Sequence, residues 1–600
     1  MFWKKKNQSP NIFTVAIGGA AGDGVREAGT NLGQFLTKLG FEVFVSFDYP
    51  SLIRGGHNFS RISFSKEKIY NDYSKIDVLI ALNDETMHLH KNDLNAEAVV
   101  FSDKFDAEDL KMFGQNAVLL PMVKTAEESN APAITRTSVA LGAVCYLLDL
   151  PFDEMDQILR RVFKEKGYEI NITLAEKGYK YLEKLGFRHS RRMEHGGDKG
   201  KELADGNTAF AKGLLAAGLD FYIGYPMTPS TSILHYLAKN QSRRPEGSGL
   251  SDGVRHSSES SDRPQASEKE KTFKVIHPEN EISVINMALG AAYAGKRTAI
   301  GTAGGGFALM QEAFALAGMS ETPIAIAVSQ RQAPATGSPT HTSQGDLKWI
   351  INSGHGEFPR IVIAPGDPEE AFKAGADALN LTWKYQMPAI VLLDKHLSEN
   401  SSTVIFNSNE ITVERGKIDE KINSEYKRYQ ITEDGVSPMA YPGTPDAVIK
   451  VTSYEHSEEG ISTEDPKMVK AMGDKRFSKL KQLEKDFSKY ETVKFYGDPK
   501  SKNIVVFWGS TKGAVLEAAK YLKNQPKFLQ ILWMSPFDTE KVAENLKNAK
   551  KVIIVENNRS GQLASIIREK TGINIENKIL KYDSLPFDVV ELAKQLNEIL

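Results

Sequence analysis

The sequence is poor in the features that mark secreted, membrane-spanning and nucleic-acid-binding proteins. It has a single cysteine, Cys145, among 600 residues. No disulfide can therefore form within the chain, and the chain alone cannot hold a four-cysteine iron–sulfur cluster or a cysteine-built zinc site. No apolar run approaches the roughly 18 residues that a membrane-spanning helix needs. A formal net charge of -2 disfavours nucleic acid or an anionic membrane as the main partner. These absences predict a cytoplasmic protein whose redox metal centre, if it uses one, belongs to a partner.

What is present is an ordinary globular composition, with 41% hydrophobic and 25% charged residues. The first block, residues 10–190, begins with an apolar strand at 12–17, a glycine-rich turn at 18–24 and a run of apolar residues at helical spacing. Further strands are predicted at 42–47 and 76–82. Strand, turn and helix in this order predict an open α/β sheet whose switch point lies near the glycine-rich turn.

The turn at 18–24 allows several interpretations. Glycines let backbone N–H groups approach a phosphate at a helix start, but the spacing fits the dinucleotide pattern poorly, and a simple tight turn explains the residues equally well. A nicotinamide dehydrogenase would need an acid after the second strand, and Asp48 stands there. The Gly22-Asp23-Gly24 run is similar to a thiamine diphosphate metal motif but lacks the later asparagine, so we interpret it as a turn.

The rest of the chain predicts two more α/β units. Residues 205–397 contain short apolar strands separated by helical patterns, and 497–600 repeat this arrangement. Within the middle unit, 240–271 has almost no large apolar residue, which predicts a mobile insertion. Residues 398–496 are charged and lack apolar periodicity, which predicts an extended connector.

Three polar segments of the middle unit are candidates for a functional site. The loop at 224–231 contains two prolines around Thr228, after a strand and before a helix, where α/β folds bind ligands. Glu281 starts a helix rich in glycine and alanine, whose close packing would bury the carboxylate and raise its pKa, as proton exchange with a heterocycle requires. Arg331 ends a strand, and its planar fork suits a carboxylate ligand, although a structural ion pair is the alternative. His341 lies in the loop that follows.

These segments occur in order with others, and together they resemble the alpha subunit of the 2-oxoacid:ferredoxin oxidoreductases, especially the 2-oxoglutarate type, with a gamma domain fused at the N-terminus. The resemblance covers nearly the whole chain. The segments that carry it are 54–56, 225–231, the helix at Glu281, 304–306, 330–331, 354–360, 429–438, 455–460, 472–476 and 560–562.

The resemblance implies three α/β domains: a gamma domain, a pyrimidine-binding domain of thiamine diphosphate enzymes, and a transketolase C-terminal-like domain. It implies that a separate beta subunit holds most of the thiamine diphosphate, its Mg²⁺ and a [4Fe-4S] cluster, so that this chain has no metal site and is inactive and colourless alone. Coenzyme A would be the co-substrate and ferredoxin the electron acceptor. The assembly would be an alpha–beta pair or its dimer.

Carried over residue by residue, the resemblance implies that Glu281 hydrogen-bonds the aminopyrimidine ring and that Tyr225 and Pro226 also contact the cofactor. Thr228 and Arg331 would hold the 1-carboxylate and carbonyl of the substrate. The implied reaction is oxidative decarboxylation of a 2-oxoacid to its acyl-CoA, with 2-oxoglutarate to succinyl-CoA preferred. Many 2-oxoglutarate-type members have Lys or Arg where this chain has His341, so a pyruvate-using or broad-specificity enzyme is the alternative. A non-catalytic scaffold subunit is disfavoured because Thr228, Glu281 and Arg331 are all retained.

Overall fold

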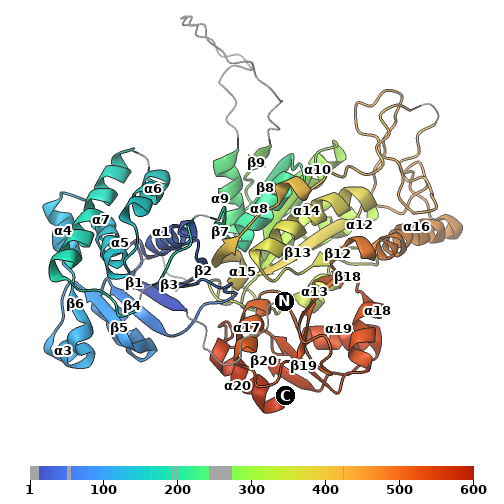
Figure 1. Ribbon diagram of the computed structural model, residues 1–600. Coiled ribbons are helices and arrows are strands. Elements are labelled where there is room, and N and C mark those ends of the chain that lie inside the picture. Colours follow the sequence, from blue (N-terminus) through green and yellow to red (C-terminus); the bar gives the residue numbers. More distant parts are fainter. Residues whose placement is uncertain are drawn as a thin grey trace, which may run out of the picture.

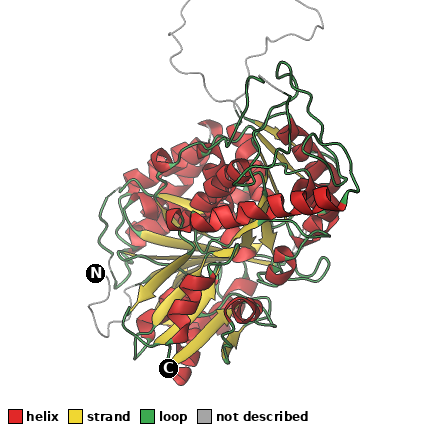
Figure 2. Ribbon diagram, turned by 90° about the vertical axis from the view of Figure 1, so that its right-hand side faces the viewer, coloured by secondary structure: helices red, strands yellow, loops and turns green. Residues whose placement is uncertain are grey.

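The computed structural model describes residues 12–50, 56–163, 165–191, 193–197, 199–241, 273–422 and 425–600. They form an α/β protein with three sheets, which confirms the predicted fold class (Figure 1). Helices lie against the sheets, as the view by secondary structure shows (Figure 2). No helix in these ranges is both long and apolar enough to cross a membrane.

The first sheet has the strand order β6-β5-β4-β1-β3-β2-β14-β7. β3 lies between β1 and β2 and runs antiparallel to both. Sequence patterns did not predict β3, whose residues HNFSRISFS include several polar side chains. The strands are β1 (Phe13–Ala20), β2 (Glu42–Asp48), β3 (His57–Ser65), β4 (Ile76–Ala81), β5 (Leu94–Ser102), β6 (Ala117–Leu119), β7 (Glu202–Asp205) and β14 (Ser401–Val404).

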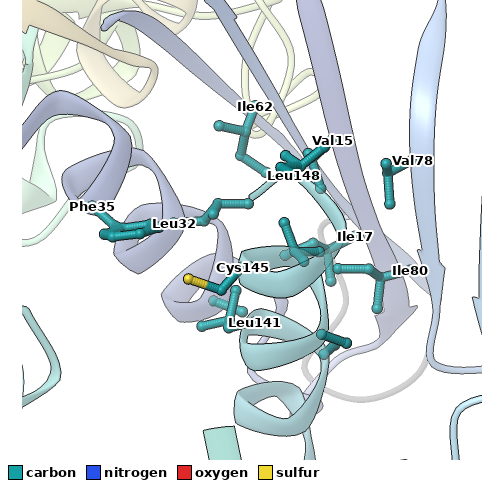
Figure 3. Packing of buried hydrophobic residues seen from close by; sticks show 14 of the residues in the cluster. Val15, Ile17, Leu32, Phe35, Ile62, Val78, Ile80, Leu141, Cys145 and Leu148 are labelled. Carbon is teal, nitrogen blue, oxygen red and sulfur yellow. The ribbon is translucent and has the colours of Figure 1, made fainter. Parts of the chain in front are cut away.

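The core of the first unit buries the single cysteine. Helix α5 (Arg136–Leu147) packs closely on α7 (Glu165–Leu185), because a side chain at Gly142 or Gly178 would strike the backbone of the other helix. Cys145 lies among Leu141 and other apolar side chains of this core (Figure 3). Burial raises the pKa of the Cys145 thiol above its ordinary value, so the thiol stays protonated and serves as a core residue.

The second sheet has the order β18-β12-β13-β11-β10-β8-β9 and is parallel except for β18. Its central strands are apolar on both faces because helices cover both sides. The carboxyl ends of the parallel strands therefore share one edge, where loops can converge. The strands are β8 (Phe221–Gly224), β9 (Lys274–Ile276), β10 (Thr298–Thr302), β11 (Ile324–Gln330), β12 (Ile361–Ile363), β13 (Pro388–Asp394) and β18 (Trp533–Ser535).

The third sheet has the order β15-β17-β16-β19-β20. Strands cross between the units: β18 comes from the last block and joins the second sheet, while β7 and β14 flank the middle block and join the first. The three units are thus tied together by backbone pairing. The remaining strands are β15 (Val493–Gly497), β16 (Asn503–Trp508), β17 (Lys527–Ile531), β19 (Lys551–Glu556) and β20 (Asn577–Leu580).

The helices of the first unit, besides α5 and α7, are α1 (Val25–Lys38), α2 (Asp84–His90), α3 (Ala107–Phe113), α4 (Met122–Glu128) and α6 (Phe152–Val162). Those of the middle of the chain are α8 (Gly206–Ala216), α9 (Thr231–Asn240), α10 (Glu281–Tyr293), α11 (Gly304–Leu309), α12 (Gln311–Met319), α13 (Leu347–Ile351), α14 (Pro368–Tyr385), α15 (Lys395–Glu399) and α16 (Pro466–Lys485). The last unit has α17 (Thr511–Ala518), α18 (Thr539–Lys547), α19 (Gln562–Thr571) and α20 (Val589–Ile599).

The segment 398–496 differs from the extended connector that its composition predicts. It contains β14 and the 20-residue helix α16. The buried positions of α16 are Met472, Lys475, Arg476, Lys479 and Leu483, so most of its buried face is charged. This helix could not be predicted from a regular spacing of apolar residues, because lysine and arginine occupy most of the positions that face the rest of the protein. Nearly all of the predicted insertion 240–271 lies outside the described residues.

Candidate functional site

The predicted site residues come from three points on the carboxyl edge of the second sheet. Tyr225, Pro226 and Thr228 follow β8, and Arg331 follows β11 directly. Glu281 is the first residue of α10. Both α10 and the strand β8 pack against β10, so the fold brings these segments to one place.

The loop after β8 is held by hydrogen bonds to its backbone. The hydroxyl of Ser230 donates to the carbonyl of Met227 at 2.8 Å, and the buried amide of Asn207 donates to the carbonyl of Pro229 at 2.7 Å. Ser230 stands at the N-cap of α9, but its side chain makes no capping bond. Its hydroxyl fixes the loop instead, which keeps Thr228 in a defined position.

Arg331 contacts this loop directly. Its Nη1 donates to the carbonyl oxygen of Thr228 at 2.6 Å. The structure thus brings together two predicted residues that are 103 positions apart. Burial lowers the pKa of the Arg331 guanidinium, yet no carboxylate among the described residues forms an ion pair with it. The structural ion pair considered as the alternative is absent from the described part of the chain, and the remaining N–H groups are available to an anionic ligand.

Glu281 is buried, with 5% of its surface exposed. The preceding residue, Asn280, caps α10 by accepting a hydrogen bond from the amide of Ser283 at 2.9 Å. Glu281 is therefore not the capping residue, and its carboxylate forms no hydrogen bond or ion pair within the described ranges. A buried acid without an internal partner can exchange a hydrogen bond or a proton with a bound group.

Gly306 lets the stem of this acid pack close to the backbone of α11. A Cβ atom at Gly306 would lie 2.9 Å from Cγ of Glu281 and 3.1 Å from Sδ of Met227, and it would also strike Oγ1 of Thr302. Any side chain at this position would displace these neighbours, so the close approach of Glu281 to α11 requires glycine here. Met227, Thr302 and Gly306 lie beside Glu281, and sequence patterns assigned none of them a role of its own. Met227 lies within the loop at 224–231, and Gly306 belongs to the 304–306 run that carries the family resemblance.

Another acid stands at the opposite end of the same glycine run. Oδ2 of Asp346 lies 2.7 Å from the position that a Cβ of Gly304 would occupy. Burial raises the pKa of Asp346 to about 6. The family resemblance implies that the loop 336–346 covers the rest of the substrate, and it gives Asp346, the last residue of that loop, no role of its own. The proximity of Asp346 to Gly304 depends on the pairing of β10 with β11.

The other predicted residues are close to this site in the backbone. The carbonyl of His341 accepts from the amide of Gln332 at 3.1 Å, which ties the His341 loop to the residue after Arg331. No hydrogen bond joins the His341 side chain to Arg331, Thr228 or Glu281. Tyr225 is partly exposed, and its ring lies 5.8 Å from that of His277. No group of three or more His, Cys, Asp or Glu side chains in the described ranges could hold a metal ion.

In the glycine-rich turn at 18–24, the carboxylate of Asp23 lies where a bound phosphate would be expected. Oδ2 of Asp23 accepts from the amide of Ala20 at 2.8 Å, and Oδ1 pairs with Arg136 at 2.8 Å. A phosphate would have to displace this carboxylate. Asp48 ends β2, but β3 separates β2 from β1. The arrangement that a dinucleotide site needs, with the acid on the strand next to the turn, is therefore not formed.

Comparisons with known proteins place these features in context. Residues 14–181 match the family described as pyruvate ferredoxin/flavodoxin oxidoreductase. Residues 212–474, which include the site, match the family described as pyruvate flavodoxin/ferredoxin oxidoreductase, thiamine diP-bdg.

Whole proteins match over nearly the full chain. A 2-oxoacid:ferredoxin oxidoreductase subunit alpha from Sulfolobus sp is 32% identical, covering 97% of this chain and 96% of that protein. The 2-oxoglutarate synthase subunit KorA of Methanocaldococcus jannaschii is 29% identical over 60% of this chain and 88% of its own. The structure of 2-oxoglutarate:ferredoxin oxidoreductase from Magnetococcus marinus, with 2-oxoglutarate, coenzyme A and succinyl-CoA bound, has a TM-score of 0.82 and 29% identity, covering 98% of this chain and 99% of that one. The name alpha subunit implies a beta subunit.

Proposed function

Because this chain belongs to the 2-oxoacid:ferredoxin oxidoreductase alpha subunits, we propose that it forms, with a separate beta subunit, an enzyme that converts a 2-oxoacid and coenzyme A to an acyl-CoA and CO₂. Two electrons leave the substrate in this reaction, and we assign them to ferredoxin. Two alpha–beta pairs would form the full assembly, which we place in the cytoplasm.

The observation that carries this proposal is the meeting of two charges without an ion-pair partner, the buried Glu281 and the half-buried Arg331, at one edge of the second sheet. Arg331 can bind the 1-carboxylate that all 2-oxoacids share, and its bond to the carbonyl of Thr228 fixes its orientation. Glu281 offers a buried carboxylate to a heterocyclic group. A chain that only supported a catalytic partner would have no need to keep either charge unpaired, because an uncompensated buried charge destabilises the fold.

The residues around Glu281 fit the aminopyrimidine of thiamine diphosphate. Gly306 lets the stem of Glu281 pack close to α11, and Met227 adds an apolar side chain beside it. When bound, thiamine diphosphate supplies the carbon nucleophile and the electron sink for decarboxylation. Glu281 would hold a proton between its carboxylate and a ring nitrogen, and Tyr225 and Pro226 would border the ring. Mg²⁺ and the [4Fe-4S] cluster are assigned to the beta subunit, since Cys145 is buried in a core.

We propose 2-oxoglutarate as the preferred substrate. Relatives named KorA and the Magnetococcus structure with bound 2-oxoglutarate support this choice. His341 would face the distal carboxylate of a dicarboxylic substrate, because its loop is tied to the residue after Arg331. A pyruvate-using or broad-specificity enzyme is the alternative, because an imidazole attracts a distal carboxylate less than a fixed cation does.

The test is to purify this chain alone and together with its beta subunit, and to assay 2-oxoacid-dependent reduction of viologen with coenzyme A. We expect the isolated chain to be colourless and inactive and the complex to turn over, fastest with 2-oxoglutarate. Activity of the chain alone, or an iron–sulfur absorption in it, would contradict the assignment of the cluster and most of the cofactor to the beta subunit. Turnover with pyruvate exceeding that with 2-oxoglutarate would favour the alternative substrate.

A further inference from the structure

The carboxylate of Asp346 has no partner in the described part of the chain. Only its backbone is engaged, by a hydrogen bond from its amide to Oε1 of Gln330 at 3.0 Å. Desolvation alone accounts for the rise of its pKa to about 6. A partly buried acid of this kind is costly unless a donor or a cation meets it.

The loop that carries Asp346 is fixed, so the side chain is held in place from both sides. Nε2 of Gln562 donates to the carbonyl of Gly345 at 2.6 Å, and Oε1 of Gln562 accepts from the amide of Lys348 at 2.8 Å. Gln562 belongs to α19 of the last unit. This explains the 560–562 segment singled out in the sequence: it positions a loop of the middle unit.

The surface next to Asp346 is open and apolar. A Cβ at Gly305 would meet nothing within 4 Å, so another molecule can approach the glycine run from outside. Leu309 of α11 is 55% exposed, Trp349 of α13 is 36% exposed and Ile282 of α10 is 52% exposed. The ring of Trp349 lies 5.6 Å from that of Phe307, which joins α13 to α11. Exposed apolar side chains on neighbouring helices are typical of a protein interface rather than of a small-ligand site.

We propose that Asp346 receives a positively charged side chain, an arginine or lysine, of the beta subunit that completes the active site. This inference rests on the proposed function. The apolar side chains of α10, α11 and α13 would be covered by the same subunit, and the ion pair would fix its register next to Glu281. We infer a cationic partner from charge complementarity. Asp346 has no internal partner and lies among exposed apolar groups, so a cation that becomes buried with it on assembly would satisfy it best.

The matched control is Asp377 of α14. Burial raises its pKa to about 6 as well, but Asp377 lies near Lys373 and Glu491, on the helix that packs against α8, away from the glycine run. Asp346→Asn and Asp377→Asn therefore remove similar carboxylates from two different places. Because the Asp346 side chain makes no internal hydrogen bond and its uncompensated charge is costly, Asp346→Asn should not lower the unfolding temperature of the isolated chain and should raise it at neutral pH.

The experiment measures the dissociation constant of the complex between separately purified alpha and beta chains at pH 7.5 and pH 5.5. At pH 7.5, Asp346→Asn should weaken the complex by at least about tenfold, and Asp377→Asn should bind like the wild type. The wild-type complex should weaken as the pH falls through about 6, because protonation removes the charge of Asp346, and Asp346→Asn should lack this component. The charged side chains on the elements packed around this loop are Glu281, Glu312, Arg331, Lys348, Arg559, Arg568, Glu569 and Lys570, none of which pairs with Asp346.

Equal affinity of the wild type and Asp346→Asn at both pH values would overturn the inference. Unchanged affinity with a loss of turnover would also overturn it, because Asp346 would then act at the reacting centre. If the wild-type chains form no complex, the proposed function fails instead, so the two failures are distinguishable.

Discussion

Two groups of charged residues in the middle of the molecule, one fully buried around Glu321 and one formed by the buried Glu281 and the half-buried Arg331, differ in whether the chain itself supplies their counter-charges. Glu321 accepts hydrogen bonds from Lys475 at 2.7 and 2.8 Å and also pairs with Lys479, and these side chains are at most 1% exposed. Arg428 donates to the backbone carbonyl of Glu321 at 2.9 Å. Around Glu281 and Arg331, by contrast, the described residues supply no counter-charge.

The difference separates structural from functional charge. The Glu321 cluster satisfies itself and thereby attaches α16 to the turn after α12. A buried charge for which the same chain supplies no counter-charge is tolerated when a bound molecule supplies the missing partner. The comparison therefore predicts that changes in the first cluster alter folding and that changes in the second alter chemistry.

The strongest test of this comparison is Glu281→Gln. The amide keeps the size and hydrogen-bonding capacity of the side chain but cannot exchange the proton, so turnover of the alpha–beta complex should fall by about 10²- to 10⁴-fold. The unfolding temperature should stay the same or rise, since the carboxylate has no internal partner to lose and its uncompensated charge is removed. Turnover near the wild-type rate would show that this acid only starts a helix.

Glu321→Gln should have the opposite profile. Removing the acid leaves Lys475 and Lys479 buried without their counter-charge, which should lower the free energy of unfolding by about 3–5 kcal/mol. Urea unfolding followed by circular dichroism measures this loss. The turnover per folded complex should stay close to that of the wild type, and a variant as stable as the wild type would contradict the structural role.

The two lysines of the cluster should differ from each other. Burial lowers the pKa of Lys479 to about 7, whereas an unfolded lysine keeps its ordinary value of 10.5. The unfolded chain therefore binds more protons between these pH values, and the free energy of unfolding should rise with pH there, by at most about 1.4 kcal/mol per pH unit. Lys479→Met should flatten this rise between pH 7 and 9.

Burial lowers the pKa of Lys475 as well, so Lys475→Met is compared with Lys479→Met for stability rather than for pH dependence. Lys475 contacts both oxygens of Glu321, so its loss should destabilise the chain more than the loss of Lys479. Equal losses of stability in the two variants, measured in urea at pH 7, would mean that the second lysine carries as much of the pairing as the first.

The smallest expected effect concerns substrate selectivity, which we assign to His341. His341→Arg should lower KM for 2-oxoglutarate severalfold and leave KM for pyruvate nearly unchanged, because only the former has a distal carboxylate. Arg331→Ala should impair both substrates alike, since both have a 1-carboxylate. An unchanged ratio of kcat/KM between the two substrates in His341→Arg would place His341 outside the substrate pocket.

Those parts of the structure that depend on local residue patterns could be predicted from the sequence. The central strands β11 and β13 are apolar runs buried on both faces, and such runs predict strands wherever they occur. The loop at Thr228, the helix start at Glu281 and the strand end at Arg331 were found because prolines, a small-residue helix and the boundary between strand and loop are local signals.

Tertiary structure decided the features that depend on distant partners. The polar strand β3 is stable only between β1 and β2, and α16 is stable with a charged buried face only because Glu321, 154 residues before Lys475, receives its lysines. Asp346 looks like an ordinary loop acid until β10 and β11 pair and bring Gly304 beside it. The sequence alone determined which residues are candidates for the chemistry, whereas the fold decided which charges are paired, because a charge is compensated by whatever packing brings within a few ångströms of it.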